Sequence, residues 1–253
     1  MTRRHALRDD QWDRIKDLLP GREGTVGVTA KNNRLFVEAV LYRYRTGCPW
    51  RDLPERFGDF RVVHTRFSRW AKSGVWERVF KELARDADNE YAMIDATIVR
   101  AHQHSAGAQK KFGEDQAIGR SKGGLSTKIH ATVDALGNPT GIHLTPGQAH
   151  DLVGADELLP FLEAKVLIAD KAYDADERVI EPLRAAGKEP VIPPRSNRRQ
   201  PRLYDKDLYK ARSLVEIFFC SLKQFRAIAT RYDKTARNFL AAIFLASAAI
   251  WLN

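Results

Sequence analysis

The sequence predicts an α/β fold preceded by a small all-helical, helix-turn-helix-like segment: residues 1–88 helical, and residues 89–253 a mixed sheet with flanking helices. Two observations lead to this prediction. Before residue 88, apolar residues recur at the three- and four-residue spacing of amphipathic helices. Beyond it, short runs rich in aliphatic and β-branched residues alternate with helical stretches, as they do in sheets covered by helices.

The helical segment is expected to start with a helix that Asp9 and Asp10 can cap and that ends at Pro20. A second helix is expected over residues 31–45, where Gly47 and the following proline would end it, and a further one over residues 76–87. Both show apolar side chains at helical spacing, so the helices should pack as a small bundle.

Between these helices, the sequence WRDLPERFGDFRVVHTRFSRWAKSG indicates a short helix near residues 51–57, a turn at Gly58 and a second helix over residues 61–72. This order resembles a helix-turn-helix, whose second helix contacts DNA. An ordinary helical hairpin with a solvated basic face explains the sequence equally well. The polar side chains that would meet DNA are Arg61, Thr65, Arg66, Arg69 and Lys72.

Five strands are expected after residue 88. The first three cover YAMIDATIV, KIHATVD and TGIHLT, and a turn at Gly137 suits a hairpin between the second and the third. The fourth and fifth, AKVLIAD and EPVIPP, alternate with helices over HDLVGADELLPFL and DADERVIEPLRAAG. Hairpin strands are antiparallel and strands joined through helices are parallel, so the five-stranded sheet should be mixed.

Two basic stretches, residues 104–124 and 193–207, are expected to be loops because they hold few apolar residues. Either could become ordered on a phosphate backbone. Solvated, mobile loops are the alternative interpretation. The arginines of the second stretch that would contact DNA are Arg195, Arg198, Arg199 and Arg202.

The chain carries a net charge of +10, from 42 Lys and Arg against 32 Asp and Glu residues. Such an excess favours a polyanionic partner, usually nucleic acid, although a merely soluble, arginine-rich protein is the alternative. The two cysteines, Cys48 and Cys220, lie far apart and indicate neither a disulfide framework nor a zinc site.

A cytoplasmic protein without a membrane partner is expected. The first residues, MTRRHALRDDQW, lack the apolar core of a signal peptide. The most apolar run, residues 239–252, is too short to cross a bilayer and indicates a buried helix instead.

Two aspartates lie within or directly after apolar runs that are expected to form strands. Asp95 interrupts the apolar run 93–99, and Asp170 directly follows the apolar residues 166–169. A carboxylate in an apolar strand needs a partner, a proton or a metal ion. In α/β sheets, functional groups gather at the carboxyl ends of the strands. Taken singly, each aspartate could equally be a turn former or a helix cap.

A third carboxylate, Glu216, belongs to a segment whose spacing is the most informative of the chain. Wound as one helix, the segment places Glu216 within a ~60° arc together with a phenol, a guanidinium and an ammonium group. Apolar residues fall on the opposite side, so this face is free to meet a nucleic-acid backbone over ~21 Å. The other members of this row are Tyr209, Arg212 and Lys223.

Carboxylates without neighbouring cysteine or clustered histidine favour a hard cation, so Mg²⁺, with Mn²⁺ able to substitute, is the expected cofactor. Two such ions ~3.5–4 Å apart can hold the attacking and the leaving oxygen of a phosphodiester. The residues therefore point to metal-dependent phosphoryl transfer on DNA. The metal ligands would be Asp95, Asp170 and Glu216.

The stretches YAMIDATIVRAHQ, LIADKAYDADE and YKARSLVEIFFCSLKQF together resemble the DDE transposases of bacterial insertion sequences, in particular the type named after insertion sequence five. The Tyr-Arg-Glu-Lys spacing is a specific signature of that group. CPWRDLPERFG and RFSRW also resemble its N-terminal domain, so the resemblance covers essentially the whole chain.

The resemblance implies an RNase H-like catalytic core in which Asp95, Asp170 and Glu216 are the catalytic triad. For the second aspartate, Asp174 is the alternative, and Asp170 is preferred because it directly ends the strand. Larger relatives carry a β-rich insertion before the glutamate helix, where this chain has only residues 193–207. The resemblance also implies that three residues hold the transposon end: Tyr209, Arg212 and Lys223.

The function implied by this resemblance is cut-and-paste transposition. Residues 1–88 would bind the terminal inverted repeats of double-stranded DNA, and residues 89–253 would cut the ends and join them to target DNA. Because two ends must be brought together, a homodimer on DNA is expected. An RNase H-like nuclease and a DNA-binding regulator that has lost catalysis are the alternatives.

Overall fold

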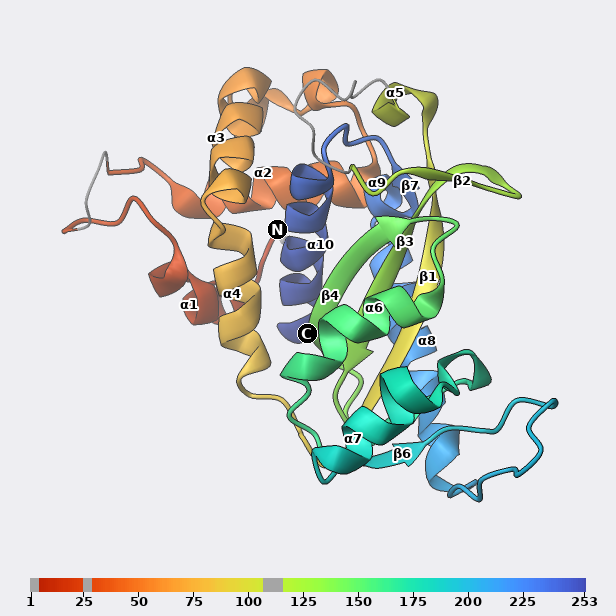
Figure 1. The fold of residues 1–253 in the computed structure, drawn as a ribbon. Helices are drawn as coiled ribbons and strands as arrows, with labels where there is room; N and C mark the ends of the chain where they lie inside the picture. Colours follow the sequence, from red (N-terminus) through yellow and green to blue (C-terminus); the bar gives the residue numbers. More distant parts are fainter. Residues whose placement is uncertain (1–4, 25–28, 107–115) are drawn as a thin grey trace.

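The computed structural model describes residues 5–24, 29–106 and 116–253. The first part of the chain is helical, as predicted, and its helices lie beside the long C-terminal helix α10 (Figure 1). These elements are α1 (Asp9–Ile15), α2 (Asn33–Thr46), α3 (Phe60–Lys72), α4 (Val75–Ala84) and α10 (Ala236–Trp251).

The segment expected to be the first helix of a helix-turn-helix is different in the structure. It forms two separate 3₁₀ turns, Trp50–Asp52 and Glu55–Phe57, rather than one helix. Pro54 explains the break, because a proline disfavours helical geometry in the residue before it, and Leu53 is extended there. The predicted second helix is present as α3, with the Asp59 carboxylate accepting a hydrogen bond from the Arg61 N–H at 2.8 Å.

The rest of the chain forms a mixed sheet covered by helices, which confirms the predicted fold class. All five predicted strands are present, but the sheet has seven strands within the described residues rather than five. The two additional strands are only three and two residues long, too short to show a periodicity in the sequence. The strands are β1 (Ala92–Ala101), β2 (Gly119–Ser121), β3 (Gly124–Val133), β4 (Pro139–Pro146), β5 (Val166–Ala169), β6 (Glu189–Val191) and β7 (Thr230–Arg231).

Strand β1 is the centre of the sheet. It pairs antiparallel with β3, which pairs antiparallel with β4, and on its other edge it pairs parallel with β5, which pairs parallel with β6. The five main strands therefore run in the order β4-β3-β1-β5-β6. Residues 107–115, part of the predicted loop 104–124, lie outside the described residues.

Helices cover both faces of the sheet (Figure 1). On one face, α6 and α7 close a small core that includes Ile94 of β1 and the fully buried Tyr173. On the other face, α8 and α10 close a larger core that includes Met93 and Val99. The helices beyond the N-terminal group are α5 (Gln103–Ala106), α6 (Asp151–Leu158), α7 (Glu181–Ala185), α8 (Ser213–Lys223) and α9 (Arg226–Ala229).

The larger core continues without a break into the N-terminal helices. Phe80 of α4 and Phe244 of α10 lie with their ring centroids 5.1 Å apart. A buried polar contact crosses the same boundary: the Tyr44 hydroxyl of α2 lies 3.1 Å from each carboxylate oxygen of Asp233, just before α10. The Arg43 guanidinium lies 3.7 Å from the same carboxylate. Burial and the Asp233 charge raise the pKa of Tyr44, so its hydroxyl stays protonated and donates.

Within the described residues, no helix combines the length and the apolar character that a membrane-spanning segment needs. The run 239–252 belongs to α10, and its apolar side chains pack into the protein core.

His130 of β3 is a buried titratable group between the sheet and α6. A Cβ placed on Gly154 of α6 would overlap its ring, and its Nε2 lies 2.8 Å from the Thr145 hydroxyl. Burial lowers the pKa of His130 to about 4 from an ordinary value of 6.5. The folded protein therefore binds this proton less tightly than the unfolded chain does, and stability falls as the pH drops from 6.5 to 4.

From this pKa difference we expect His130 to remove roughly 2 kcal/mol of unfolding free energy between pH 7 and pH 5. His130→Gln keeps a polar partner for Thr145 without a titrating ring, so it should lose that much less over the same range. Urea unfolding of both proteins at the two pH values measures the difference. Equal losses in the two proteins would contradict this explanation.

Candidate active site

Asp95 and Asp170 begin from neighbouring backbone positions. The parallel pairing of β1 and β5 ends at the pair Ile94 and Ala169, so the next residue on each strand is one of the two aspartates. Neighbouring strands lie ~4.8 Å apart, which makes these two residues close neighbours in space. The sheet thus brings together two carboxylates that are far apart in the sequence.

Each aspartate also has a local backbone contact. One Asp170 carboxylate oxygen accepts a hydrogen bond from the Ala172 N–H at 2.8 Å, at the start of the 3₁₀ turn Lys171–Tyr173. One Asp95 oxygen accepts from the Ala96 N–H at 2.7 Å. Burial raises the pKa of Asp95, the negative charge of Asp170 acts in the same direction, and Arg212 opposes both. Ionisation of the Asp95 carboxyl is therefore less favourable than that of an exposed aspartate, and a nearby cation favours the ionised form.

The segment expected to be one continuous helix starts differently. Tyr209 and Arg212 belong to a 3₁₀ turn, Leu208–Arg212, whereas Glu216 and Lys223 belong to α8. A 3₁₀ turn advances about 120° per residue, so residues three apart, such as Tyr209 and Arg212, still lie on one face. The segment is therefore not the one continuous α-helix that was expected, but its geometry still allows the row of side chains from residue 209 to residue 223.

The side chains of this segment nevertheless converge on β1. The Arg212 guanidinium donates to the Asp95 carboxylate at 2.9 Å and also donates to the Glu216 carboxylate. The Lys223 ammonium lies 2.6 Å from the Thr97 hydroxyl, two residues beyond Asp95. Because the Arg212 guanidinium contacts both carboxylates, Asp95 and Glu216 lie on either side of a single side chain.

Tyr209 lies beside this group, half-buried and with its ring centroid 5.5 Å from that of Tyr204. Burial raises the pKa of Tyr209, and the neighbouring charge of Asp170 adds to the effect while Arg212 opposes it. The phenol is therefore protonated and can donate a hydrogen bond to an anion.

The carboxylates of the site suit a metal ion in their chemistry, but Arg212 lies between two of them. Among the residues that the structure describes, no three Asp, Glu, His or Cys side chains lie close enough together to hold a metal. A protein cation occupies the space instead, since Arg212 bridges Asp95 and Glu216. The donor set itself, carboxylate oxygens without sulfur or imidazole, suits Mg²⁺ or Mn²⁺. The residues fit such an ion chemically, provided that Arg212 leaves the carboxylates.

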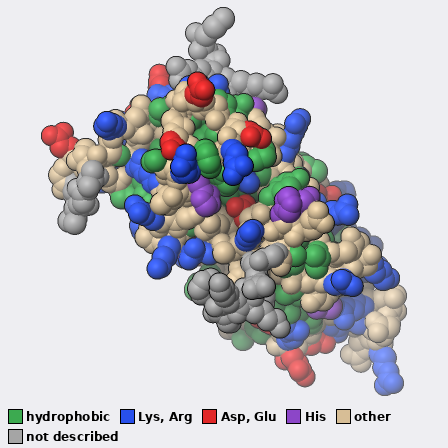
Figure 2. Space-filling view, turned by 90° about the horizontal axis from the view of Figure 1, so that it is seen from above, with side chains coloured by type: hydrophobic (Ala, Val, Ile, Leu, Met, Phe, Trp, Pro, Cys, Tyr) green, Lys and Arg blue, Asp and Glu red, His purple; other side chains and the backbone are tan. Residues whose placement is uncertain are grey.

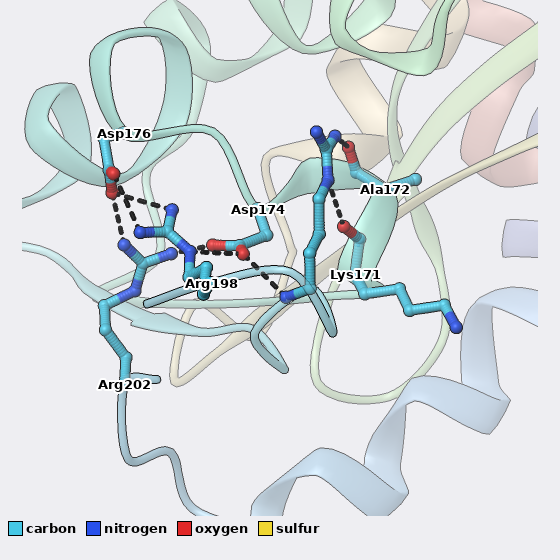
Figure 3. Close-up of polar contacts among 7 residues, drawn as sticks. Lys171, Ala172, Asp174, Asp176, Arg198 and Arg202 are labelled. Atoms are coloured by element: carbon cyan, nitrogen blue, oxygen red, sulfur yellow. Dashed lines mark hydrogen bonds and ion pairs between the residues drawn. The ribbon is translucent and has the colours of Figure 1, made fainter. Parts of the chain in front are cut away.

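Several arginines of the basic loop 193–207 already have partners within the protein. Arg195, Arg198 and Arg202 all make contacts within the protein, on the turn that follows Asp170 (Figure 3). Arg199 is exposed. Acidic side chains hold Arg198 and Arg202, and backbone carbonyl oxygens hold the side chain of Arg195. Contact of these arginines with DNA stays a prediction.

Asp174, the alternative to Asp170, is one of those acidic partners. Its side chain is fully buried and paired with Arg198 and Arg202. Its carboxylate is therefore committed to a structural contact, whereas Asp170 stands beside Asp95.

The polar face of α3 borders a hollow of about 670 Å³, which residues 20–21 and 29–30 also line. Arg61, Thr65 and Arg69 line it and are exposed. Arg66 also lines it but is half-buried, and its guanidinium lies 4.3 Å from the centroid of the Phe36 ring. Lys72 is exposed at the end of the helix and does not line the hollow.

The end of the molecule at which α3 begins is strongly basic. Figure 2 views this end and shows Lys and Arg side chains scattered over it, with fewer acidic ones, among hydrophobic and uncharged atoms. Such a surface suits a polyanion.

Comparison with known proteins decides the family. Residues 7–80 match the model of a putative transposase of the IS4/5 family, and residues 88–251 match the model of a transposase DDE domain. The chain belongs to the DDE transposase family. It is therefore an enzyme of DNA transposition, from a family that uses divalent metal ions.

Three curated proteins are similar to this chain, and one of them is named a putative transposase. A putative transposase for insertion sequence element IS6501 of Brucella ovis is 42% identical over 133 residues, which is 51% of this chain and 100% of the relative. The uncharacterized protein y4sN of Sinorhizobium fredii is 54% identical over 110 residues, 43% of this chain and 86% of that protein. The insertion element IS402 uncharacterized 16.2 kDa protein of Burkholderia cepacia is 32% identical, covering 44% of this chain and 82% of the relative.

Among solved structures, the transposase is similar to the piggyBac transposase in a synaptic complex with hairpin DNA, with a TM-score of 0.40 and 13% identity. The match covers 75% of this chain and 48% of that chain. A likeness this distant supports no comparison of individual residues.

The sequence did not reveal two features of this transposase: the Arg212 bridge between Asp95 and Glu216, and the pairing of Asp174 with the loop arginines. The spacing of four residues between Arg212 and Glu216 was a local signal for the first, because such pairs meet on a helix. No local signal announces the second, since its partners are 24 residues or more apart.

Proposed function

We propose that this transposase binds the terminal inverted repeats of its element, cleaves the DNA ends with the help of divalent metal ions, and joins them to target DNA. The observation that carries the proposal is that Arg212 contacts Asp95 and Glu216 at once, while Asp170 directly follows the β5 residue that pairs beside Asp95. These three acids come from β1, the end of β5 and α8, and no requirement of the core explains why they should meet.

In this proposal, Asp95, Asp170 and Glu216 hold Mg²⁺, or Mn²⁺ in its place. When bound, a pair of such ions lowers the pKa of an attacking water or 3′-hydroxyl group and stabilises the leaving oxygen of the phosphodiester. The protein supplies the negative cage and fixes its position on the rigid edge of the sheet. Burial of Asp95 strengthens the need for cations there, since it raises the free energy of an uncompensated carboxylate.

Arg212 has two uses in this proposal. Without DNA, it neutralises Asp95 and Glu216. With DNA bound, its planar guanidinium can instead donate two hydrogen bonds to one phosphate, which releases the carboxylates for metal. Lys223 of α8, which contacts Thr97 of β1, adds a second positive charge. The Tyr209 phenol adds a hydrogen-bond donor or a stacking surface. All three residues would then lie along the DNA end.

The exposed face of α3 would bind the double-stranded repeat, through Arg61, Thr65, Arg69 and Lys72, with Arg66 held closer to the protein. The arginines of loop 193–207 are not part of this proposed interface, apart from the exposed Arg199. We expect a homodimer when two ends are paired, in a cytoplasmic protein that meets the nucleoid through DNA.

We expect the double variant Arg61→Gln/Arg69→Gln to bind terminal-repeat DNA more weakly and with a shallower salt dependence. Each phosphate contact contributes a slope of ~0.9 in log K against log salt, so the loss of two should reduce the slope by about 1.8. Fluorescence anisotropy over a range of salt concentrations measures it. The matched control, Lys81→Gln/Arg85→Gln, removes two exposed charges from α4. A slope that changes equally in both double variants would exclude α3 as the specific contact.

The proposed function is tested by incubating the transposase and Mg²⁺ with DNA that carries the terminal repeats of its own element, and with an unrelated plasmid. We expect nicks at the repeat ends and joining of the freed 3′-ends to the plasmid. Cleavage without any joining would identify a nuclease. Binding of the repeats without cleavage in either Mg²⁺ or Mn²⁺ would identify a DNA-binding regulator.

A further inference from the structure

A cluster of ion pairs and hydrogen bonds, here named the arginine clamp, lies beside the turn that carries Asp170. Asp174 and Asp176 pair with Arg198 and Arg202 (Figure 3), and Arg195 adds hydrogen bonds. The two aspartates follow the 3₁₀ turn after β5, and the three arginines belong to loop 193–207. The partners are 21 to 28 residues apart in the chain, so the clamp ties together two segments that no strand pairing joins.

Asp174 is the centre of the arginine clamp. Its side chain is completely buried, and it accepts a hydrogen bond from the Arg198 Nε at 2.5 Å and another from the Arg202 guanidinium. Arg198 also donates two hydrogen bonds to Asp176, at 2.8 and 3.0 Å, and Arg202 donates to the same group. Both guanidinium groups thus bridge the two carboxylates, which fixes orientation as well as distance.

Arg195 completes the clamp through the backbone. Its N–H donates to the Asp174 carboxylate at 2.8 Å, and its side chain donates to the carbonyl oxygens of Lys171 and Ala172, at 3.2 and 2.8 Å. Those two residues directly follow Asp170, and Ala172 also donates the N–H that holds the Asp170 carboxylate. Arg195 therefore acts on the peptide groups that set the position of Asp170.

The clamp also lies between the two halves of the proposed active site along the chain. Beyond Arg202, the Asp205 carboxylate accepts hydrogen bonds from the N–H groups of Asp207 and Leu208, at 2.8 and 2.9 Å, at the start of the turn that carries Tyr209 and Arg212. The turn that carries Arg212 thus follows the clamp arginines after a short connection, and the Asp205 hydrogen bonds order its start.

We propose that the arginine clamp is a positioning device: it fixes the Asp170 turn relative to the turn of Arg212, so that Asp170 can share metal ions with Asp95 and Glu216. The proposal rests on the proposed function, because it assigns the clamp a role in the same metal site. In this proposal, Arg195, Arg198 and Arg202 position the Asp170 turn and do not contact DNA.

A buried carboxylate that loses its cations is strongly destabilised, so the clamp holds one arrangement rather than several. Residues that orient metal ligands from behind typically change metal affinity by about 10- to 100-fold when replaced. Replacing a clamp residue should therefore lower the affinity for metal, and should change the maximal rate at saturating metal much less.

The test compares Arg202→Gln with the control Lys206→Gln, which removes one exposed positive charge from the same loop. Mn²⁺ binding to the full-length protein is measured by electron paramagnetic resonance, and the Mg²⁺ dependence of end cleavage is measured separately. We expect Arg202→Gln to raise the dissociation constant for Mn²⁺ and the half-saturating Mg²⁺ concentration about tenfold, with the rate at saturating Mg²⁺ within about twofold. Lys206→Gln should change neither metal value.

If Arg202→Gln does not fold, Asp176→Asn provides the same test, because Asp176 is 45% exposed and its loss leaves Asp174 with both arginines. Equal Mn²⁺ affinities in the wild type, the clamp variant and the control would overturn the proposal. So would an unchanged metal affinity with a salt slope of DNA binding reduced by ~0.9, which would make Arg202 a phosphate contact. If the wild type itself neither binds Mn²⁺ nor cuts DNA, the proposed function fails instead.

Discussion

Asp95→Asn is expected to reduce cleavage of the terminal repeats about 10²- to 10³-fold, the range found when one group that stabilises a transition state is removed. Asparagine keeps the size of the side chain but loses the charge that we propose holds metal beside Asp170. The same variant should bind the repeats as tightly as the wild type or more tightly, because a negative charge near the DNA phosphates is removed. A cleavage assay in Mg²⁺ and an anisotropy measurement of binding check the two halves of this prediction.

The matched control is Asp156→Asn, which removes an acid that is 45% exposed on α6, where it pairs with Arg178. It should cut normally. Asp170→Asn and Glu216→Gln should behave as Asp95→Asn does, and a double variant should be hardly worse than either single one, since the three groups act as one site. If Asp95→Asn cut at the wild-type rate, the three acids would not be the catalytic group.

Asp233→Ala is expected to destabilise the protein by about 3–5 kcal/mol. Asp233 is the acceptor for the buried Tyr44 hydroxyl and the carboxylate nearest to the buried Arg43 guanidinium. Its removal leaves a cation and a hydroxyl in the core without their acceptor. At roughly 2–4 °C per kcal/mol for a chain of this size, the melting temperature should fall by about 6–20 °C.

Differential scanning calorimetry measures this loss, with Asp86→Ala as the control, because Asp86 pairs with Arg14 at the surface and is 70% exposed. The control should change stability by less than about 1 kcal/mol. A small loss for Asp233→Ala would mean that the N-terminal helices do not depend on this contact for their packing against α10.

The catalytic candidates were accessible from the sequence because their signals are local. Asp95 interrupts an apolar strand and Asp170 ends one, and a parallel pair of strands brings such positions to the same edge of a sheet. The mixed sheet followed from the alternation of strands and helices, and the structure confirms it. The roles of the individual site residues remain predictions.

Two features that the sequence did not reveal have no local signal in the sequence. The 3₁₀ geometry of Leu208–Arg212 replaces the first turn of the expected α-helix, and nothing in the apolar periodicity of α8 reveals it. The pairing of Asp174 with Arg198 joins residues 24 positions apart. A run of arginines in a polar stretch looks the same whether its partner is DNA or a buried carboxylate.

The most direct test of the account is a crystal structure of the transposase with Mn²⁺ and a terminal-repeat duplex, in which anomalous scattering locates the metal. We predict Mn²⁺ bound by Asp95, Asp170 and Glu216 at the scissile phosphate, with Arg212 moved from the carboxylates to the DNA. Manganese bound elsewhere, with Arg212 still bridging Asp95 and Glu216 in the presence of a positioned DNA end, would contradict it.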